Sequence, residues 1–339
     1  MKINKSPVPT TVNYGINDFE FDEQILCVSK KFANYNIKNA QNCKFNVNYS
    51  IITPEFIVEQ NHNFCASLVI TKSQSEPIVI QIEPNEDNNV LVDYINIKAE
   101  SFVNAAVIIE YVSKSKVYCN TLVNVSVEQN SNLNVTIVCD LAKQSTNLIK
   151  FTNLVQNNST LTYKIIDFCS LYSVHNFSSK VEEKSSCDLG CIYLGNKNNK
   201  IDINYTQNVV GENANANITC VGALNDSAEK NFKGTINFVK GAKRAKGTEN
   251  ELCLLLSPNA KSKALPMLLC AEEDVDGSHS SSVGKISDKE LFYVNSRGID
   301  KTEAIKIFVK AKFDTVLKNL DKSIKEKIIQ KIDKELDNG

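Results

Sequence analysis

Histidine and cysteine are the side chains of this sequence best suited to chemistry. The chain has three histidines, His62, His175 and His279, and eleven cysteines. Imidazole transfers protons or binds metals near neutral pH, and a thiolate is both a nucleophile and a metal ligand. His279 stands apart because its segment, AEEDVDGSHSSSVG, places it between an acidic run and three serines, where it could be exposed. It could serve as a metal ligand, as a general base or as an ordinary turn residue.

The cysteines and the other histidines show no ligand pattern. Cys187 and Cys191 have C-x3-C spacing, but no second cysteine pair and no histidine lies nearby in the sequence. Zinc and iron-sulfur sites need such further ligands. We therefore interpret both cysteines as core residues, because a free cysteine packs as a small hydrophobic side chain. His62 lies in a polar turn and His175 in a strand-like segment, and we assign both a structural role.

Carboxylates near His279 offer an alternative chemistry. Glu272, Glu273, Asp274 and Asp276 could supply the acid pair of a carbohydrate-cleaving enzyme, although clustered acids at a strand end are more often simply solvated. The sequence contains no G-x-x-x-x-G-K-[ST], G-x-G-x-x-G, G-x-S-x-G or H-E-x-x-H motif. We therefore do not expect this chain to hydrolyse ATP through a P-loop of its own.

Composition limits the class of protein and its partners. The 339 residues are 42% hydrophobic and 23% charged, which is typical of a folded globular chain. The net charge of -1 and the presence of only two arginines argue against binding to nucleic acid or to an anionic membrane. The segment MKINKSPVPT has no apolar core of a signal peptide. The odd number of cysteines favours reduced thiols, and we expect a cytoplasmic protein.

Short strands separated by polar turns make up most of the chain. Asparagine is concentrated there, with 38 of 42 before residue 251. Aligned turn-to-strand junctions place Leu133, Leu161, Leu189 and Ala216 at spacings of 28, 28 and 27 residues. The segment 58–70, VEQNHNFCASLVI, is similar to the segment 127–139, VEQNSNLNVTIVC. A repeat of this length built from strands predicts a β-helix, in which each turn of chain stacks on the next. A β-sandwich or barrel is the alternative.

Helical periodicity replaces the strands after Ser287. Ser287 and Glu290 have the spacing of a capping box, and the first helix should close near Gly298. Asp300 and Glu303 repeat that spacing at a second helix. Its expected apolar face is Ile305, Phe308, Val309, Phe313, Val316, Leu317 and Leu320. Ser323 and Glu326 could cap a third helix, whose apolar residues are Ile324, Ile328, Ile329, Ile332 and Leu336.

Three stretches resemble one family. They are residues 232–268, which include LLLSPNA; residues 274–299, which include the D-V-x-x-S-H run and LFYVNSRGI; and the helix that follows. These motifs resemble the SufB/SufD family of iron-sulfur cluster assembly scaffolds, and they fit SufD better than SufB, whose equivalent run is typically E-H-E-A-T. The resemblance is dense over about 70 residues and weaker over the rest of the chain.

The resemblance implies a fold and a set of partners. It implies a mainly β protein with a right-handed parallel β-helix core at 41–286, a short N-terminal extension at 1–40 and a helical C-terminal segment at 287–339. Such subunits pair through the β-helix, with a SufB-type subunit or as a homodimer. The helical segment binds a SufC-type ABC ATPase, which would supply ATP hydrolysis. The corresponding candidates for docking the ATPase are Leu291, Phe292, Tyr293, Arg297, Gly298, Ile299 and Phe308.

The resemblance also implies site residues. His279 matches a histidine at the interface of the paired subunits that is implicated in cluster assembly, and it is a candidate metal ligand. Gly277 stands where SufD proteins often have cysteine, and Glu251 stands where SufB has the cysteine thought to receive sulfur. Cys253 lies two residues later, on the same face of a strand. The cluster would be transient and shared with a partner, and flavin binding stays open.

We therefore expect a SufD-like scaffold subunit that is not itself an enzyme. One alternative is a self-pairing SufB/SufD-like scaffold that uses Cys253 and His279. Two others belong to different classes of protein, namely a β-helix interaction module and a carbohydrate-active enzyme.

Overall fold

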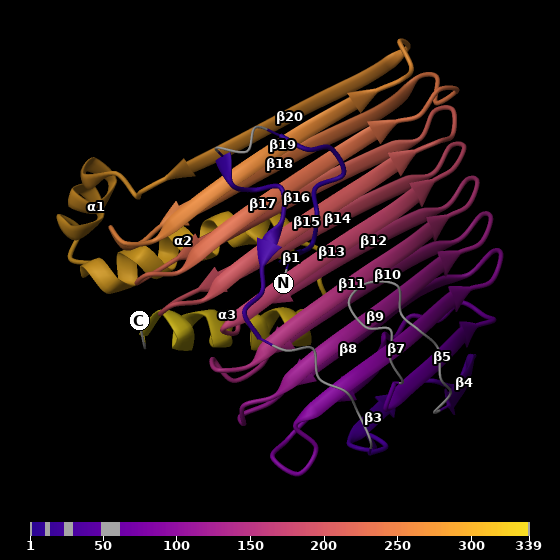
Figure 1. The fold of residues 1–339 in the computed structure, drawn as a ribbon, viewed down its shortest axis with the longest axis horizontal. Helices are drawn as coiled ribbons and strands as arrows, with labels where there is room; N and C mark the ends of the chain where they lie inside the picture. Colours follow the sequence, from indigo (N-terminus) through magenta and orange to yellow (C-terminus); the bar gives the residue numbers. More distant parts are fainter. Residues whose placement is uncertain (1, 11–13, 24–29, 49–61, 338–339) are drawn as a thin grey trace.

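The structure, a computed structural model, describes residues 2–10, 14–23, 30–48 and 62–337. The part 58–61 of the repeat that begins at residue 58 lies outside the described residues. Two nine-stranded sheets face each other and form a solenoid of about eight turns (Figure 1). The alternative of a sandwich or barrel is wrong, because successive strands alternate between the sheets and pair in parallel with the strands two positions away.

The strands divide evenly between the two sheets. The sheet that carries the helices, here the helix-covered sheet, contains β3 (Tyr35–Lys38), β6 (Ile78–Ile82), β8 (Asn104–Val112), β10 (Asn132–Asp140), β12 (Thr160–Asp167), β14 (Ser186–Gly195), β16 (Asn215–Leu224), β18 (Ala245–Leu255) and β20 (Val275–Gly284). The opposite sheet contains β4 (Cys43–Asn48), β5 (Phe64–Ile70), β7 (Val90–Ala99), β9 (Tyr118–Val127), β11 (Thr146–Val155), β13 (Tyr172–Val181), β15 (Lys200–Val209), β17 (Glu229–Phe238) and β19 (Lys261–Cys270). Among the described strands of these two sheets, β3 and β4, at the start of the stack, are the ones that pair antiparallel to their neighbours.

The register confirms part of the predicted repeat. Leu133 pairs with Leu161, 28 residues later, as predicted. The next position is wrong, since Leu161 pairs with Cys187 and not with Leu189, and Cys187 then pairs with Ala216. The chain between β12 and β13 is shorter than its equivalent between β10 and β11, which moves the register by two residues. Leu189 nevertheless stays inside, because a two-residue shift keeps the same face of a strand.

The similar segments 58–70 and 127–139 also do not occupy equivalent places in the solenoid. Phe64 and Leu133 occupy equivalent positions in the two segments, and both are buried. However, β5 belongs to the opposite sheet and β10 to the helix-covered sheet. Both kinds of strand follow a polar turn and bury alternate residues, so half a turn of the solenoid resembles the other half in sequence.

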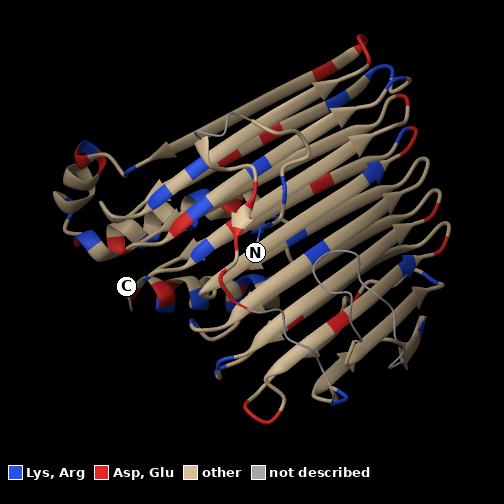
Figure 2. Cartoon of the chain, viewed as in Figure 1, with Lys and Arg blue, Asp and Glu red and all other residues tan. Residues whose placement is uncertain are grey.

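Some of the asparagines lie at turns that need left-handed backbone. Asn130, Asn158 and Asn213 have φ between 56° and 59° at equivalent turns, a conformation that asparagine tolerates better than most residues. Beside them, buried serines link one turn to the next, since Ser131 N–H donates to Ser159 Oγ (3.2 Å). The turns are therefore stacked and hydrogen-bonded like the strands they connect. Charged residues gather on these turns and on the helices (Figure 2).

Aromatic rings fill the middle of the solenoid. Phe151, Tyr163, Phe177, Tyr205 and Phe232 are almost entirely buried, and neighbouring rings lie 5.3 to 6.2 Å apart in mostly edge-to-face contacts. Such contacts add stability to the burial of large apolar surfaces. Stacking successive turns of chain therefore builds one continuous core.

Three helices follow the last strand. They are α1 (Asp288–Asn295), α2 (Lys301–Leu317) and α3 (Lys322–Asp337). The capping box of Ser287 and Glu290 is confirmed, and Asp300 accepts from the N–H of Glu303 as predicted. The third cap is wrong, because Asp321 Oδ1 accepts from Ser323 N–H and Oγ–H. Asp321, the residue just before α3, therefore caps this helix in place of Ser323.

Apolar faces of α2 and α3 pack on the outside of the helix-covered sheet. Val309, Phe313, Ile324, Ile328 and Ile332 are buried there. Gly190 on β14 allows this close approach, because a Cβ at this position would lie 2.8 Å from a methyl group of Val316. Among the described residues, no helix is both long enough and apolar enough to cross a bilayer.

The N-terminal hairpin covers the opposite sheet. It consists of β1 (Lys2–Ile3) and β2 (Phe19–Glu20) and crosses the strands in Figure 1. Asn4 donates from its side chain to Asp202 Oδ1 (2.6 Å), and Lys233 Nζ donates to the Asn4 carbonyl (2.8 Å) and to Asp202 Oδ1 (2.7 Å). The hairpin thus seals a buried ion pair against the sheet.

The inward side chains are packed so closely that a single added methyl group should lower the stability of the fold. A Cβ at Gly222 on β16 would lie 1.9 Å from the ring of Tyr193, which is fully buried. We expect Gly222→Ala to lower the free energy of unfolding by about 2 kcal/mol or more, measured by urea denaturation. Gly284→Ala is the matched control, since a Cβ at Gly284 meets nothing within 4 Å, and it should change stability by no more than about 0.5 kcal/mol. Equal effects of the two substitutions would contradict this account of the core.

Candidate functional site

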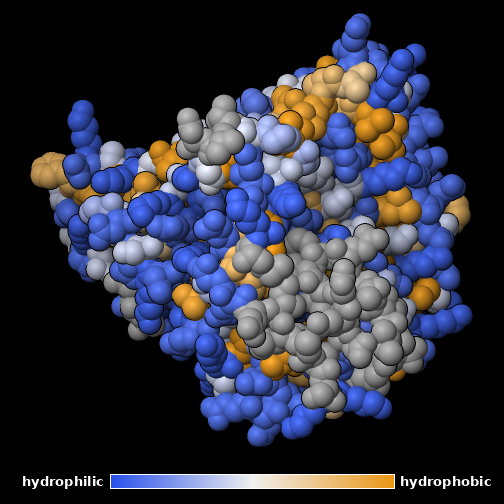
Figure 3. Space-filling view, in the orientation of Figure 1, coloured by the Kyte–Doolittle hydropathy of each residue, from blue (hydrophilic) through white to orange (hydrophobic). Residues whose placement is uncertain are grey.

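The solenoid ends on strands without a second neighbour. Among the described strands, β19 pairs only with β17, and β20 pairs only with β18. Both have ten residues, and most of β20 is exposed. Apolar side chains gather at this edge of the molecule (Figure 3), where β19 contributes the half-buried Leu265, Met267 and Leu268. We call β18, β19 and β20, with the side chains between them, the open end.

His279 lies at the centre of the open end. It is an exposed residue of β20 and is the register partner of Glu249 on β18. Glu249 points into the solenoid, and strand periodicity therefore places His279 on the inward side of an uncovered turn. The imidazole is in a strand and not in a turn. The exposure expected from the sequence is confirmed, and its cause is that no described strand lies above β20.

Cys253 is separated from His279. It lies on β18 beside Val283, four residues further along than His279, which corresponds to about 13 Å. Its side chain is fully buried, and burial raises the pKa of the thiol. Glu251 is also buried and shares the inward face with Cys253, as predicted for residues two apart. One copy of the chain therefore does not bring Cys253 and His279 together.

A polar network that the sequence did not predict lies beneath the open end. Lys230 Nζ donates to Glu251 Oε1 (2.5 Å), and both side chains are fully buried. Ser281 Oγ of the last strand donates to Glu251 Oε2 (2.7 Å). Tyr193 hydroxyl donates to Glu251 Oε1 (3.4 Å). Glu251 stands at the position where the resemblance implies a sulfur-accepting cysteine. Its carboxylate is paired with Lys230, as a buried charge requires.

Glu249 has no such partner. Its side chain is buried, and among the described residues no cation pairs with either carboxylate oxygen. Burial raises the pKa of Glu249 to about 8, against the opposing effect of the Met267 backbone and with a smaller contribution from the Glu251 carboxylate. The carboxyl is therefore mostly neutral at pH 7. The signal in the sequence was a glutamate in an inward position of an alternating strand.

Deeper in the core, His175 belongs to a charged cluster. Its Nε2 lies 3.0 Å from Asp167 Oδ2, and its Nδ1 lies 3.2 Å from the Tyr205 hydroxyl. Although burial alone would lower it, the hydrogen bonds with Asp167 and Cys191 raise the pKa of His175 to about 9. Burial would raise the pKa of Cys191, but hydrogen bonds from Cys220 and His175 lower it to about 6. The core location predicted for Cys187 and Cys191 is confirmed.

The other predicted ligands do not form a site within one chain. Among the described residues, no group of three or more His, Cys, Asp or Glu side chains is arranged to hold a metal. The acidic run does not form a buried acid pair, because Glu272 is only half-buried and accepts from the N–H groups of Gly241, Glu273 and Asp274. These hydrogen bonds lower the pKa of Glu272, whereas a general acid of a glycosidase needs a raised pKa.

The helical segment presents an aromatic surface. Phe292 and Tyr293 on α1 are 74% and 61% exposed, and α1 buries none of its residues. The Arg297 guanidinium lies 5.4 Å from the centre of the Tyr293 ring. Gly298 has φ of 85° after α1, and Leu291, Ile299 and Phe308 are half-buried. The residues implied to dock a partner thus include an exposed aromatic pair held beside an arginine.

The raised pKa of Glu249 predicts how stability depends on pH. A folded pKa of about 8 lies above the usual value of 4.5, so unfolding releases a proton and stability falls as pH rises between these values. Glu249→Gln keeps the shape and removes the charge. We expect the variant to gain at least about 2 kcal/mol over the parent at pH 8.5 compared with pH 5, measured by chemical denaturation. Glu20→Gln, at an exposed position, should show the same difference at both pH values; a pH-independent effect of Glu249→Gln would contradict the assignment.

Comparisons with known proteins agree with the fold. A family model described as "SUF system FeS cluster assembly, SufBD core domain" matches residues 82–312. The iron-sulfur cluster assembly protein SufD of Bacillus subtilis is 30% identical over 136 residues, which cover 39% of this chain and 31% of that protein. A SufBD family protein of Pyrococcus horikoshii is 30% identical over 140 residues, covering 41% of this chain and 31% of that protein.

SufD of Escherichia coli is 29% identical over 117 residues, covering 34% of this chain and 28% of that protein. The matched part is thus about a third of the length of each of these relatives. The family model covers much more, since its range runs from the end of β6 into α2 and includes the open end and α1. The chain belongs to the SufBD family of iron-sulfur cluster assembly proteins.

Proposed function

We propose that the chain is a SufD-like scaffold subunit that assembles iron-sulfur clusters with a SufB-type subunit and a SufC-type ABC ATPase. Two of the relatives are named SufD, and the D-V-x-x-S-H run and LFYVNSRGI motif favour the same type. In this proposal the chain is not an enzyme. The missing P-loop motif agrees with ATP hydrolysis by the partner.

The observation that carries the proposal is the uncovered open end. Two ten-residue strands, β19 and β20, each leave one row of backbone N–H and C=O groups without a described partner strand. Long free edges of this kind favour pairing with another strand. A second solenoid meeting this end would satisfy both edges and cover the half-buried apolar residues of β19. Pairing of two subunits is therefore the simplest way to complete the fold.

His279 would then lie inside the interface. An imidazole on β20 would be close to residues of the second subunit, and imidazole is a known ligand of iron in clusters, although thiolates are commoner. Because one chain provides no group of three metal ligands among its described residues, the partner must supply the others. The cluster is cargo that the paired subunits build and pass on.

The burial of Cys253 favours a SufB-type partner over self-pairing. A sulfur-accepting thiol must be reachable and partly ionised. Cys253 is fully buried, and burial raises the pKa of its thiol. The adjoining position, Glu251, is committed to Lys230 and Ser281. The thiol that receives sulfur is therefore better supplied by another subunit, and a self-pairing scaffold that uses Cys253 is the less favoured alternative.

The exposed surface of α1 is the proposed contact for the ATPase. Large aromatic residues are costly to leave in water and are enriched at the centres of interfaces. Phe292 and Tyr293 form such a pair on α1, which follows the last strand of the solenoid and precedes α2 and α3. ATP-driven movement of the partner could be transmitted to the open end through the short link 285–287 between β20 and α1.

Replacing His279 should separate cluster formation from subunit assembly. The chain is co-expressed anaerobically with SufB-type and SufC-type subunits, and the complex is purified for mass, iron and sulfide analysis. We expect His279→Ala to leave the ternary complex intact and to reduce its cluster content at least tenfold, because a ligand is lost while the strand edges are kept. Ser280→Ala, whose hydroxyl bonds to Asn250 on the outward side, is the control and should retain the cluster.

The opposite results are equally informative. Full cluster content in His279→Ala would show that the imidazole is not part of the assembly site. Failure of the parent chain to bind either partner would reject the scaffold proposal. Cluster formation by a complex of this chain with the ATPase alone, lost in Cys253→Ser, would favour the self-pairing alternative.

Replacing Phe292 should weaken capture of the ATPase. We expect Phe292→Ala to lower the affinity for the SufC-type subunit at least tenfold, since a buried aromatic anchor contributes about 2 kcal/mol or more. Phe102→Ala is the matched control, because Phe102 is also 74% exposed but lies in a turn near the start of the solenoid. Isothermal titration calorimetry measures both. Equal affinities of the two variants would place the contact elsewhere.

A further inference from the structure

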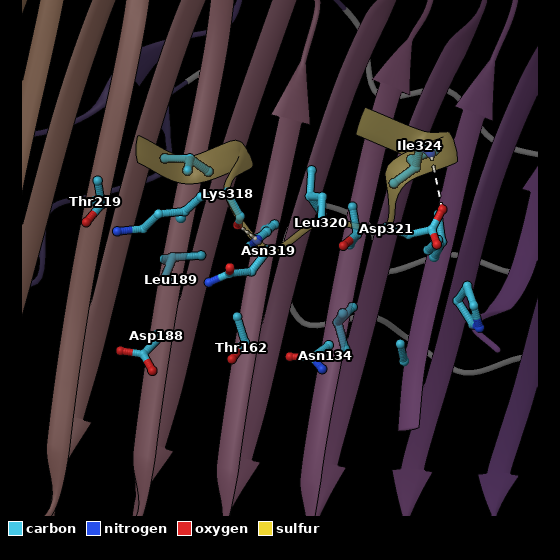
Figure 4. A pocket seen from close by; sticks show the side chains of 18 of the residues that line it. Asn134, Thr162, Asp188, Leu189, Thr219, Lys318, Asn319, Leu320, Asp321 and Ile324 are labelled. Atoms are coloured by element: carbon cyan, nitrogen blue, oxygen red, sulfur yellow. Dashed lines mark hydrogen bonds between the residues drawn. The ribbon is translucent and has the colours of Figure 1, made fainter. Parts of the chain in front are cut away.

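A pocket lies between the helix-covered sheet and the link from α2 to α3 (Figure 4). Its volume is about 760 Å³, and it is lined by outward residues of β8, β10, β12, β14 and β16 and by residues 315–324. Sites for small molecules usually have volumes of about 300 to 1,000 Å³. The pocket lies on the outer face of the sheet, whereas His279 and Glu249 belong to the inner face, so it is separate from the open end.

The floor of the pocket changes character along the strands. Where α2 and α3 pack, the outward residues are apolar, for example Ile166, Ile192 and Val221. Nearer the beginnings of the strands they are polar and form two rows in register. The row next to the helices contains Thr136, Lys164, Gly190 and Thr219, and the second row contains Asn134, Thr162, Asp188 and Asn217. The two rows are about 7 Å apart along the strands.

The first row contains an ammonium group that lacks a counter-ion. Lys164 is half-buried, and its Nζ donates to the carbonyl of Lys318 at the end of α2 (2.7 Å). Burial and the nearby charges of Lys325 and Lys318 lower the pKa of Lys164 to about 8. Lys325 is already paired with Asp314 (2.6 Å). Asp321 also lines the pocket, but its Oδ1 accepts hydrogen bonds from Ser323 and from the N–H of Ile324. Among the described carboxylates, none forms an ion pair with Lys164 or Lys318, so these two ammonium groups lack a counter-ion.

The second row has acceptors and amides for neutral polar groups. Asp188 Oδ1 accepts from the Asn217 side-chain amide (2.6 Å), and Oδ2 accepts from Ser186 Oγ (3.4 Å). Each carboxylate oxygen can accept more than one hydrogen bond. Figure 4 shows Asn134, Thr162 and Asp188 side by side on neighbouring strands of the floor. On the opposite wall, Asn319, with φ of 66°, carries the chain from α2 towards the cap of α3.

The pocket therefore has two chemically different ends within the length of one small molecule. We propose that it binds a sugar phosphate, with the phosphate at Lys164 and Lys318 and the sugar hydroxyls at Asp188 and the neighbouring amides. A phosphate group supplies the missing negative charge and accepts hydrogen bonds from both ammonium groups. The Asp188 carboxylate can accept hydrogen bonds from sugar hydroxyls, and inorganic phosphate has no sugar hydroxyls. The proposal concerns a ligand and not the cluster, and it stands independently of the proposed function.

Calorimetric titration of the full chain with ribose 5-phosphate tests the proposal. We expect saturable binding that becomes at least tenfold weaker in Lys164→Met and in Lys318→Met, because each removes a charge-assisted hydrogen bond. Lys180→Met, on the outward side of β13 in the opposite sheet, is the matched control and should bind as the parent does. Thermal denaturation checks that each variant is folded. Lys318 is exposed, so its variant keeps the test valid if Lys164→Met does not fold.

Asp188→Asn separates recognition of the sugar from recognition of the phosphate. We expect this variant to weaken binding of ribose 5-phosphate while leaving binding of inorganic phosphate unchanged or stronger. The proposal would be overturned if the parent chain showed no binding of ribose 5-phosphate at concentrations up to about 10 mM, which would mean a Kd weaker than the millimolar range. Equal weakening by Lys180→Met would do the same, since it would indicate attraction by overall charge. Equal affinities for ribose 5-phosphate and inorganic phosphate would overturn the sugar part.

Discussion

The structure depends on the stacking of each turn of the solenoid in register on the turn before it. Parallel pairing places the inward side chains of successive strands directly above one another, so each inward residue must fit both of its neighbours. The ring of Tyr193 over Gly222 is one tight example. The same stacking leaves the last turn with no described strand above it. The core and the open end are thus two results of one constraint.

Buried charge is distributed along this stack with different consequences. Lys230 and Glu251 neutralise each other, and a second pair, Asp202 and Lys233, is sealed by the N-terminal hairpin. Glu249, beside the first pair, stays neutral through a raised pKa. A buried pair often contributes little net stability but is costly to break. These groups therefore define how the chain must fold near its open end more than they strengthen it.

Local patterns in the sequence predicted the helices and strands well. They predicted the register between strands and the surroundings of single side chains less well. The capping box at Ser287 and the solenoid with its helical end follow from short spacings, and both are confirmed. The position of Leu189 was wrong by two residues, because the length of one turn is not encoded in the strands it connects. The burial of Cys253 and the isolation of Glu249 were not predicted, because they depend on which strands lie above and opposite, and strand periodicity gives only the face.

The two ends of the solenoid differ in the length of strand edge that their described residues offer. At the start, β3 and β4 run against their neighbours, and their described residues offer four and six residues of edge. At the finish, β19 and β20 each offer ten. Short edge strands protect against further pairing. Among the described strands, the finish of the solenoid therefore offers the longer edge to a further strand, and the start offers the shorter one.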